Sequence, residues 1–311
     1  MLKRTRSFLV LVMLLMTVTM SAQVTTATMS GKVTAQDEPI IGATIVAIHE
    51  PSGTRYGTVT NVSGQFNLQG MRTGGPYKVE ISYVGYQTAI YKGINLLLGE
   101  NYVLNVSLKE SSELLDEVVV TASKESNMKS DRAGAIMNAN RDMISNTPTI
   151  SRSISDIMRL SPQGADVGNG FAVGGGNYRQ SFVTVDGAAF NNTFGLGGNL
   201  PANGSPISLD ALEQVTVAVT PFDVRQSGFT GGAINAVTRS GDNQFRGTAY
   251  MYFNNENLKG SKVDDYELLR SKAQYYTYGA SFGGPIIKDK LFFFVNGEYE
   301  DNVTAGSNYR P

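Results

Sequence analysis

Three segments toward the carboxyl-terminal end of the chain constrain its fold most, because each alternates between two contrasting faces over about ten residues. In residues 245–254 the apolar or small face holds Phe245, Gly247, Ala249, Met251 and Phe253, and the other face holds Arg246, Thr248, Tyr250, Tyr252 and Asn254. The alternation recurs in residues 274–283 and 290–300, although Phe292 and Phe294 blur the second face of the last segment. Such strands are typical of a transmembrane β-barrel. A soluble sandwich with amphipathic strands is the alternative interpretation.

The connections between these segments support the barrel interpretation. A long polar stretch, residues 255–273, joins the first two, and the short stretch 284–289 joins the second to the third. Short periplasmic turns and long extracellular loops are the rule in such barrels, so the first strand is expected to run outward. Three strands cannot close a barrel, and an open edge in lipid leaves backbone groups unpaired at a cost of several kcal/mol each. We therefore expect the 311 residues to be an amino-terminal fragment of a larger protein.

The amino terminus reads as a secretory signal peptide over residues 1–22. Lys3, Arg4 and Arg6 precede the apolar run 8–18, and small residues follow it up to Ala22. This pattern is typical of a cleaved export signal, and the run is too short for a membrane-spanning helix. Position 23 is Gln rather than Cys, so no lipid-attachment site is expected at the cleavage point.

Composition argues against several classes of function. The net charge is −1, with 26 basic and 27 acidic residues, which predicts no nucleic-acid partner. Cysteine is absent and His49 is the single histidine, so neither disulfides nor a thiolate or histidine metal site is expected. His49 is interpreted as a residue at the edge of a turn. No Ser/His/Asp set is recognisable, so we expect neither an enzyme nor a bound cofactor.

Residues 23–110 are predicted to form an immunoglobulin-like β-sandwich. Short apolar or alternating runs at 29–34, 43–49, 65–68, 77–83 and 102–108 are separated by turn residues such as Pro51-Ser52-Gly53. Strands at such spacing are typical of sandwiches. The strings Gly31-Lys32-Val33, 39–44 and 60–66 resemble the carboxypeptidase regulatory-like domain. That resemblance implies an accessory binding or spacer module, not a peptidase.

Residues 111–130 are predicted to be a linker that carries an extended segment. Asp116 and Glu117 precede Val118, Val119 and Val120, and β-branched residues favour extended backbone. A short extended segment between two folded units can add a strand to the sheet edge of another protein. The alternative is that residues 118–120 form the last strand of the preceding domain.

Residues 131–243 are predicted to mix helix and strand. A short helix is expected within 151–160, where Ser153 and Asp156 have capping-box spacing, and a hairpin turn is expected at Asp186-Gly187 after the strand 181–185. A helical turn at 209–212 leads into a strand at 215–219, and another strand covers 231–239. The glycine-rich stretch 164–176 is interpreted as a flexible loop.

The order of these parts resembles TonB-dependent receptors of the Bacteroidetes type. Val185-Asp186-Gly187 and the segments 212–217 and 231–239 resemble their plug domain, residues 131–243 here. Segments 239–248 and 282–293 resemble the Oar-like branch rather than the SusC/RagA glycan importers, whose plug and strand motifs are missing. The extended segment resembles a TonB box, which implies TonB binding by Asp116, Glu117, Val118, Val119, Val120, Thr121 and Ala122.

The resemblance implies a mainly β protein of the outer membrane: a sandwich, an α+β plug, and the first three strands of a barrel in residues 244–311. It implies energy-coupled uptake of an unidentified extracellular ligand. TonB with its inner-membrane energising complex and outer-membrane lipid would be the partners. The alternative is a periplasmic or surface protein that binds or adheres through the sandwich and plug without transport.

Overall fold

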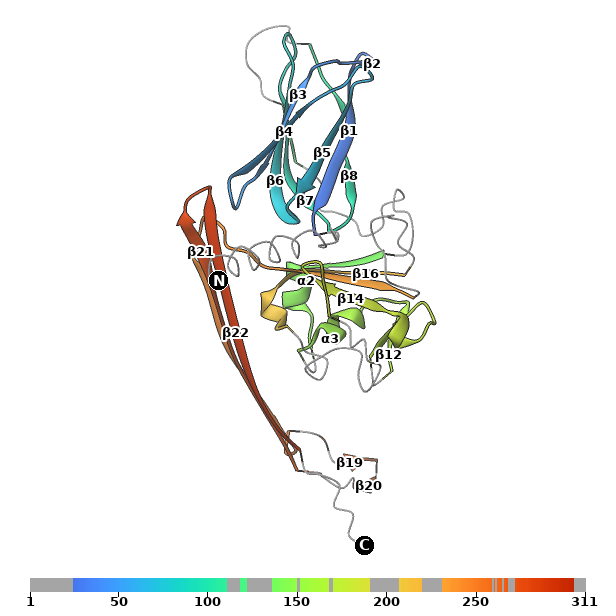
Figure 1. The fold of residues 1–311 in the computed structure, drawn as a ribbon, viewed down its shortest axis with the longest axis vertical. Helices are drawn as coiled ribbons and strands as arrows, with labels where there is room; N and C mark the ends of the chain where they lie inside the picture. Colours follow the sequence, from blue (N-terminus) through green and yellow to red (C-terminus); the bar gives the residue numbers. More distant parts are fainter. Residues whose placement is uncertain are drawn as a thin grey trace, which may run out of the picture.

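The structure, a computed structural model of the chain, describes residues 25–110, 118–121, 136–149, 152–167, 170–190, 207–219, 231–258, 260, 262–264, 266–267 and 272–304. The expected signal peptide lies outside the described residues. The described part is mainly β and has three parts (Figure 1). A sandwich lies at the top of the view, a mixed sheet with short helices lies below the sandwich, and long strands run from near the lower end of the sandwich past the side of the mixed sheet. Among the described residues, no helix has the length and apolarity needed to cross a membrane.

The first part is a β-sandwich of two five-stranded sheets, as predicted. One sheet contains β1 (Ala27–Ala35), β2 (Glu38–Pro39), β5 (Gln65–Met71), β8 (Asn101–Val103) and β9 (Val106–Ser107). The other has the order β10-β7-β6-β3-β4, with β3 (Thr44–His49), β4 (Thr54–Val59), β6 (Gly74–Ser82), β7 (Ala89–Leu96) and β10 (Val118–Thr121). Alternate residues of these strands, such as Ile45 and Val79, are fully buried between the sheets. Period-two alternation therefore fills one core.

The second part is built on a sheet of order β11-β16-β17-β14-β15. It lies in the stretch 131–243 that resembles a plug domain, and we label it the plug after that resemblance, which stays a prediction. Its strands are β11 (Ile136–Asn140), β14 (Phe182–Val185), β15 (Ala188–Ala189), β16 (Leu212–Ala218) and β17 (Ala233–Thr238). Short helices accompany them: α2 (Arg141–Asn146), α3 (Ile154–Met158), η2 (Tyr178–Gln180) and η4 (Leu209–Ala211). Apolar residues of strands and helices, among them Ile157, Leu212 and Ile234, form a second core.

Several local predictions for the plug are confirmed. Helix α3 begins after Ser153, whose backbone N–H donates to the Asp156 carboxylate at 3.4 Å. Asp186 and Gly187 both have positive φ, +48° and +80°, and they close the hairpin between β14 and β15. Two positive φ values are what a two-residue hairpin turn of the favoured hand requires.

The glycine-rich stretch 164–176 differs from its prediction. It contains the antiparallel strands β12 (Gly164–Asp166) and β13 (Phe171–Val173) rather than a loop alone. Glycine here permits close packing: a Cβ on Gly164 would lie 2.1 Å from the Phe171 ring, and one on Gly232 would lie 2.5 Å from Val173. The prediction was wrong because glycine was interpreted only as a loop former.

The third part, which we call the wall sheet, has the antiparallel order β18-β21-β22. Its strands are β18 (Arg246–Asn255), β21 (Ala273–Ile287) and β22 (Leu291–Thr304), and the strands β19 (Lys262–Val263) and β20 (Tyr266–Glu267) pair in the connection between β18 and β21. The predicted turn 284–289 was too long. β21 continues through Pro285, where the register with β22 shifts, and reaches Ile287. A proline is tolerated at such an irregularity because no ladder hydrogen bond from its nitrogen is needed.

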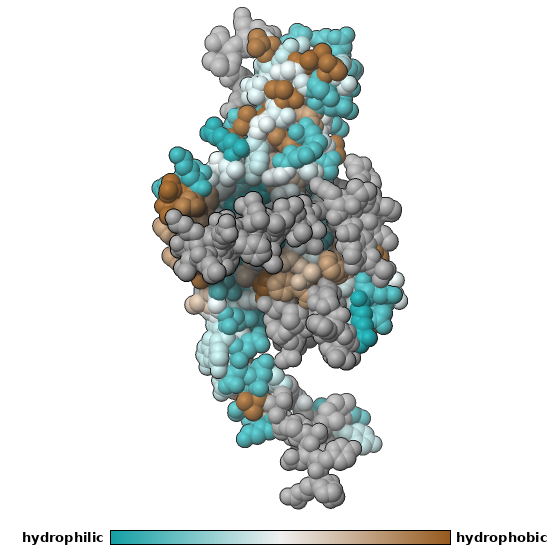
Figure 2. Space-filling view, viewed as in Figure 1, coloured by the Kyte–Doolittle hydropathy of each residue, from teal (hydrophilic) through white to brown (hydrophobic). Residues whose placement is uncertain are grey.

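The faces of the wall sheet are those expected from the alternation. Met251, Phe282, Val295 and Tyr299 are each at least half exposed. Figure 2 shows hydrophobic side chains gathered at the upper end of these strands. Thr248, Tyr250 and Ser281 point the other way, toward the plug, where their hydroxyls bond to plug residues or to one another.

Candidate coupling segment and plug–wall interface

The predicted coupling segment is described only in its middle. Val118, Val119, Val120 and Thr121 form β10, which pairs in parallel with Ala89, Ile90, Tyr91 and Lys92 of β7. Asp116, Glu117 and Ala122 lie outside the described residues. The four central residues are therefore extended, as predicted, and they form the last strand of a sandwich sheet, which was the alternative interpretation. TonB binding by this segment stays a prediction.

Asp210 is the centre of the contact between the plug and the wall sheet. Thr248 on β18 donates from Oγ1 to Asp210 Oδ2 at 2.6 Å, and the Thr248 and Ser281 hydroxyls are 2.6 Å apart. Arg141 and Arg239 of the plug approach Asp210 Oδ1 at 3.5 and 3.7 Å. Burial opposes ionisation of Asp210, but the Ser281 and Thr248 hydroxyls and the two guanidinium groups outweigh it and lower its pKa. Asp210 is thus a half-buried carboxylate held by groups from both parts.

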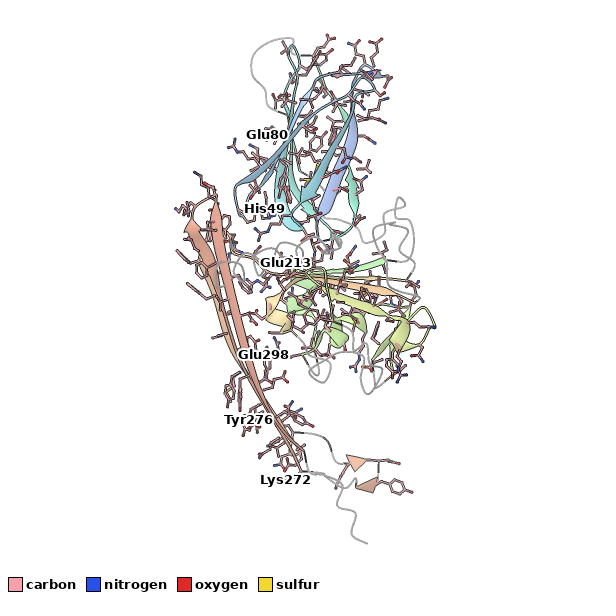
Figure 3. The ribbon with its side chains drawn as sticks, in the orientation of Figure 1. His49, Glu80, Glu213, Lys272, Tyr276 and Glu298 are labelled. Atoms are coloured by element: carbon pink, nitrogen blue, oxygen red, sulfur yellow. The ribbon has the colours of Figure 1, made fainter. Side chains whose placement is uncertain are left out.

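A second contact joins Ser208 to the middle of the wall sheet. The Ser208 hydroxyl lies 2.8 Å from the Tyr250 hydroxyl and donates to Glu298 Oε2 at 3.1 Å. Tyr250 also donates to Glu298. Glu298 comes from β22, on the side of the strands that faces the plug (Figure 3). One plug hydroxyl is therefore shared by two strands of the wall.

Arg152 provides a third contact. Its Nη1 donates to the Tyr252 hydroxyl at 2.7 Å, and its guanidinium carbon lies 4.2 and 4.8 Å from the Tyr252 and Tyr250 ring centroids. Stacking of a guanidinium on tyrosine faces is a favourable cation–π arrangement. The three contacts share a chemistry: hydroxyls and charges of the plug meet hydroxyls and a carboxylate of the wall sheet.

The sandwich meets the segment that connects the plug to the wall sheet. Arg72 donates to the Ser240 hydroxyl and to the Gly241 carbonyl, the latter at 3.4 Å, and the Asn243 backbone N–H donates to the Pro51 carbonyl at 2.9 Å. Asn243 also exchanges two hydrogen bonds with Asp289, at 2.7 and 2.9 Å. A Cβ on Gly241 would lie 2.3 Å from the Phe293 carbonyl oxygen. Only glycine therefore fits at this position of the segment that connects the plug to the wall sheet.

His49 lies at the sandwich end nearest the plug and is buried (Figure 3). Its Nδ1 is 2.7 Å from the Ser52 hydroxyl, and its ring centroid is 5.0 Å from that of Tyr77. Burial, and then the charge of Arg72, lower the pKa of His49 to about 4, while Asp242 opposes the shift. Within the described part of the chain, no three His, Cys, Asp or Glu side chains are grouped to hold a metal ion.

The plug–wall residues were missed by reasoning from the sequence. Asp210 lies in the predicted helical turn, and Thr248 lies on the predicted polar face, but they are 38 residues apart. The inward polar face of 245–254 was the signal available, because a polar face inside a barrel has to meet water or a plug. It did not indicate which plug residues would meet it.

Two family profiles match separate stretches of the chain. Residues 28–109 match the carboxypeptidase regulatory-like domain, and residues 237–310 match an outer membrane beta barrel domain. The first stretch covers the sandwich strands up to β9, and the second covers the wall sheet. The predicted resemblance of the sandwich and the assignment of the wall sheet to an outer-membrane barrel are both confirmed.

Curated relatives match across these stretches. The TonB-dependent transporter Oar of Myxococcus xanthus is 31% identical over 152 residues, which is 47% of this chain and 14% of that protein. The TonB-dependent receptor SusC of Bacteroides thetaiotaomicron is 28% identical over 281 residues, 86% of this chain and 26% of that protein. The chain thus spans about a quarter or less of either relative. The resemblance to Oar is confirmed, and SusC is also related. Both are named as a transporter or a receptor, not as an enzyme.

Among solved structures, the siderophore receptor PirA from Acinetobacter baumannii matches with a TM-score of 0.43 and 20% identity. The match covers 53% of this chain and 24% of that one. This likeness is too slight to establish a shared fold.

Proposed function

The chain is homologous to TonB-dependent transporters and receptors, and from this premise we propose that it is a portion of an outer-membrane protein that takes up a ligand with energy supplied through TonB. The plug would close the barrel, and the wall sheet would be the first strands of that barrel. Its partners would be TonB with the inner-membrane energising complex, outer-membrane lipid, and an extracellular ligand whose identity the sequence does not indicate.

The observation that carries this proposal is the polarity of the two faces of the wall sheet. Apolar side chains such as Val295 and Tyr299 are exposed on the outward face, where lipid would cover them. The inward face contacts the plug through Thr248, Tyr250 and Glu298. Polar contacts between a plug and a wall can exchange with water as they break, which suits a seal that has to be rearranged during uptake.

Coupling to TonB would act through the segment Asp116 to Ala122. Strand addition gains its affinity mainly from main-chain hydrogen bonds, so the identity of each side chain matters less than the availability of each N–H. Proline removes that donor and restricts the preceding residue.

Val119→Pro is therefore expected to abolish binding of the periplasmic part of TonB, while Val119→Thr, which keeps the N–H and the β-branch, is expected to retain it. Binding would be measured by pull-down or calorimetry, with circular dichroism to verify that the sandwich stays folded. Equal binding by Val119→Pro and the parent chain would sink the assignment of this segment.

Fractionation tests the membrane part of the proposal. We expect the native protein to stay with outer membranes after salt and carbonate washes and to require detergent for release. Release by the washes alone would support the alternative, a periplasmic or surface binding protein that does not transport.

A further inference from the structure

The outer edge of β10 is the surface from which this inference starts. β10 is the terminal strand of the order β10-β7-β6-β3-β4, so one of its edges pairs with β7 and the other continues no sheet among the described strands. An extended strand alternates its N–H and C=O groups between its two edges. Those groups of residues 118–121 that do not face β7 are therefore directed away from the sandwich.

This edge differs from the other edges of the sandwich. β2 and β9 are only two residues long and β8 is three, β2 consists of Glu38 and Pro39, and β4 carries the exposed Arg55. β5 contains Gly70 at φ +67°, close to an irregularity in its register with β1. Short length, charge, proline and local irregularity are devices that prevent a sheet edge from pairing with another chain. β10 is four residues long, Val118, Val119, Val120 and Thr121, and it contains no charged residue, no proline and no glycine.

We propose that β7 is a template that presents this segment to TonB: the sandwich holds residues 118–121 extended, and a strand of TonB adds to the outer edge of β10 as the sixth strand of the sheet. The inference rests on the proposed function, because it assigns TonB as the partner. It adds a role for the sandwich, which would do more than space the plug from the periplasm.

The energetic reason is pre-organisation. A free four-residue segment loses backbone entropy when a partner orders it, at about 1–2 kcal/mol for each residue. A segment already extended on β7 has lost that freedom before TonB arrives, so more of the pairing energy appears as affinity. The opposite arrangement is sequestration, in which TonB has to displace β7 before it can pair, and that arrangement predicts weaker binding for a docked segment.

A reversible disulfide bond between β7 and β10 distinguishes the template from sequestration. Lys92 and Thr121 are Cα partners in the register, and Lys92 is exposed. Neighbouring strands lie about 4.8 Å apart, which is within the Cα separation that a disulfide accepts. The chain contains no cysteine, so the double variant Lys92→Cys/Thr121→Cys introduces a single possible pair.

The experiment compares TonB binding by the whole chain in detergent, in its oxidised and its reduced form, with each single cysteine variant as a control. The template predicts that the oxidised form binds the periplasmic part of TonB as tightly as the reduced form, or up to about tenfold more tightly. Binding that is at least tenfold weaker in the oxidised form and restored by reductant would overturn the template in favour of sequestration. Failure of the disulfide to form in a folded chain would overturn the docking itself.

Hydrogen exchange of the parent chain gives a second measurement that needs no variant. The template predicts that amides of residues 89–92 stay protected when TonB is added, while residues 118–121 gain protection. Loss of protection in 89–92 would show displacement and overturn the inference. If neither the parent chain nor the reduced variant binds TonB at all, the proposed function fails, and that outcome is distinct from a failure of the template alone.

Discussion

The sandwich and the wall sheet use the same alternation of apolar and polar residues for opposite purposes. In the sandwich, Ile45 and Val79 are 0% exposed because a second sheet covers them. In the wall sheet, Val295 and Tyr299 are 63% and 66% exposed, and the polar face is the covered one. The comparison teaches that alternation assigns residues to a common face, whereas the surroundings decide whether that face meets protein, lipid or water.

The largest expected effect is in the sandwich core. Ile45→Ala removes a fully buried side chain between two sheets, so we expect a loss of about 2–5 kcal/mol in the free energy of unfolding. Denaturant unfolding followed by circular dichroism measures it. Val59→Ala on β4, where the side chain is 60% exposed, is the matched control and should change stability by less than about 0.5 kcal/mol. Equal losses for the two variants would contradict the sandwich arrangement.

The next effect tests whether lipid covers the outward face of the wall sheet. Val295→Arg places a charge on that face and should cost about 2–4 kcal/mol of membrane-inserted stability if the position lies near the middle of the bilayer. Val62→Arg, at a turn of the sandwich where the side chain is 77% exposed, should cost almost nothing. Recovery of the protein with lipid vesicles on flotation measures the difference. Full recovery of the Val295 variant would mean that this face meets water.

A smaller, pH-dependent effect belongs to His49. Its folded pKa of about 4 lies below the ordinary value of 6.5, so the unfolded chain binds the proton first as the pH falls. Stability from neutral His49 is therefore present above pH 6.5 and is lost progressively between pH 6.5 and about 4, by roughly 3 kcal/mol at most. Comparing urea midpoints across this range for the parent chain and His49→Gln isolates the contribution. A parent chain with the same pH slope as the variant would contradict it.

The smallest effect concerns the polar seal between plug and wall. Asp210→Asn keeps an acceptor for Thr248 but leaves Arg141 and Arg239 without their shared counter-charge, and we expect a loss of about 1–3 kcal/mol in local stability. Hydrogen exchange in β16 and β17 reports it. Asp142→Asn, at an exposed position in the first turn of α2, is the control. If the two variants exchange alike, Asp210 does not hold the plug against the wall.

Local features of the fold followed from the sequence because their causes are local. The Asp186-Gly187 turn depends on two residues that tolerate positive φ, and helix α3 begins at the spacing of Ser153 and Asp156. Helix α2 was not anticipated, since its six residues, Arg141–Asn146, are too few for a periodic apolar pattern. The β12–β13 hairpin was missed because glycine permits both a loop and close packing.

The sequence by itself determined the class of fold, the strand faces, and the extended backbone of Val118–Val120, because period-two alternation and β-branching act within a few residues. Only the tertiary structure decided that Val118–Thr121 pairs with β7 and that Thr248 donates a hydrogen bond to Asp210. It also decided that Gly241 packs against the backbone of the wall sheet at Phe293. These contacts join residues far apart in the chain. They depend on how whole sheets pack, and no local pattern encodes which distant partner will satisfy a given strand edge or carboxylate.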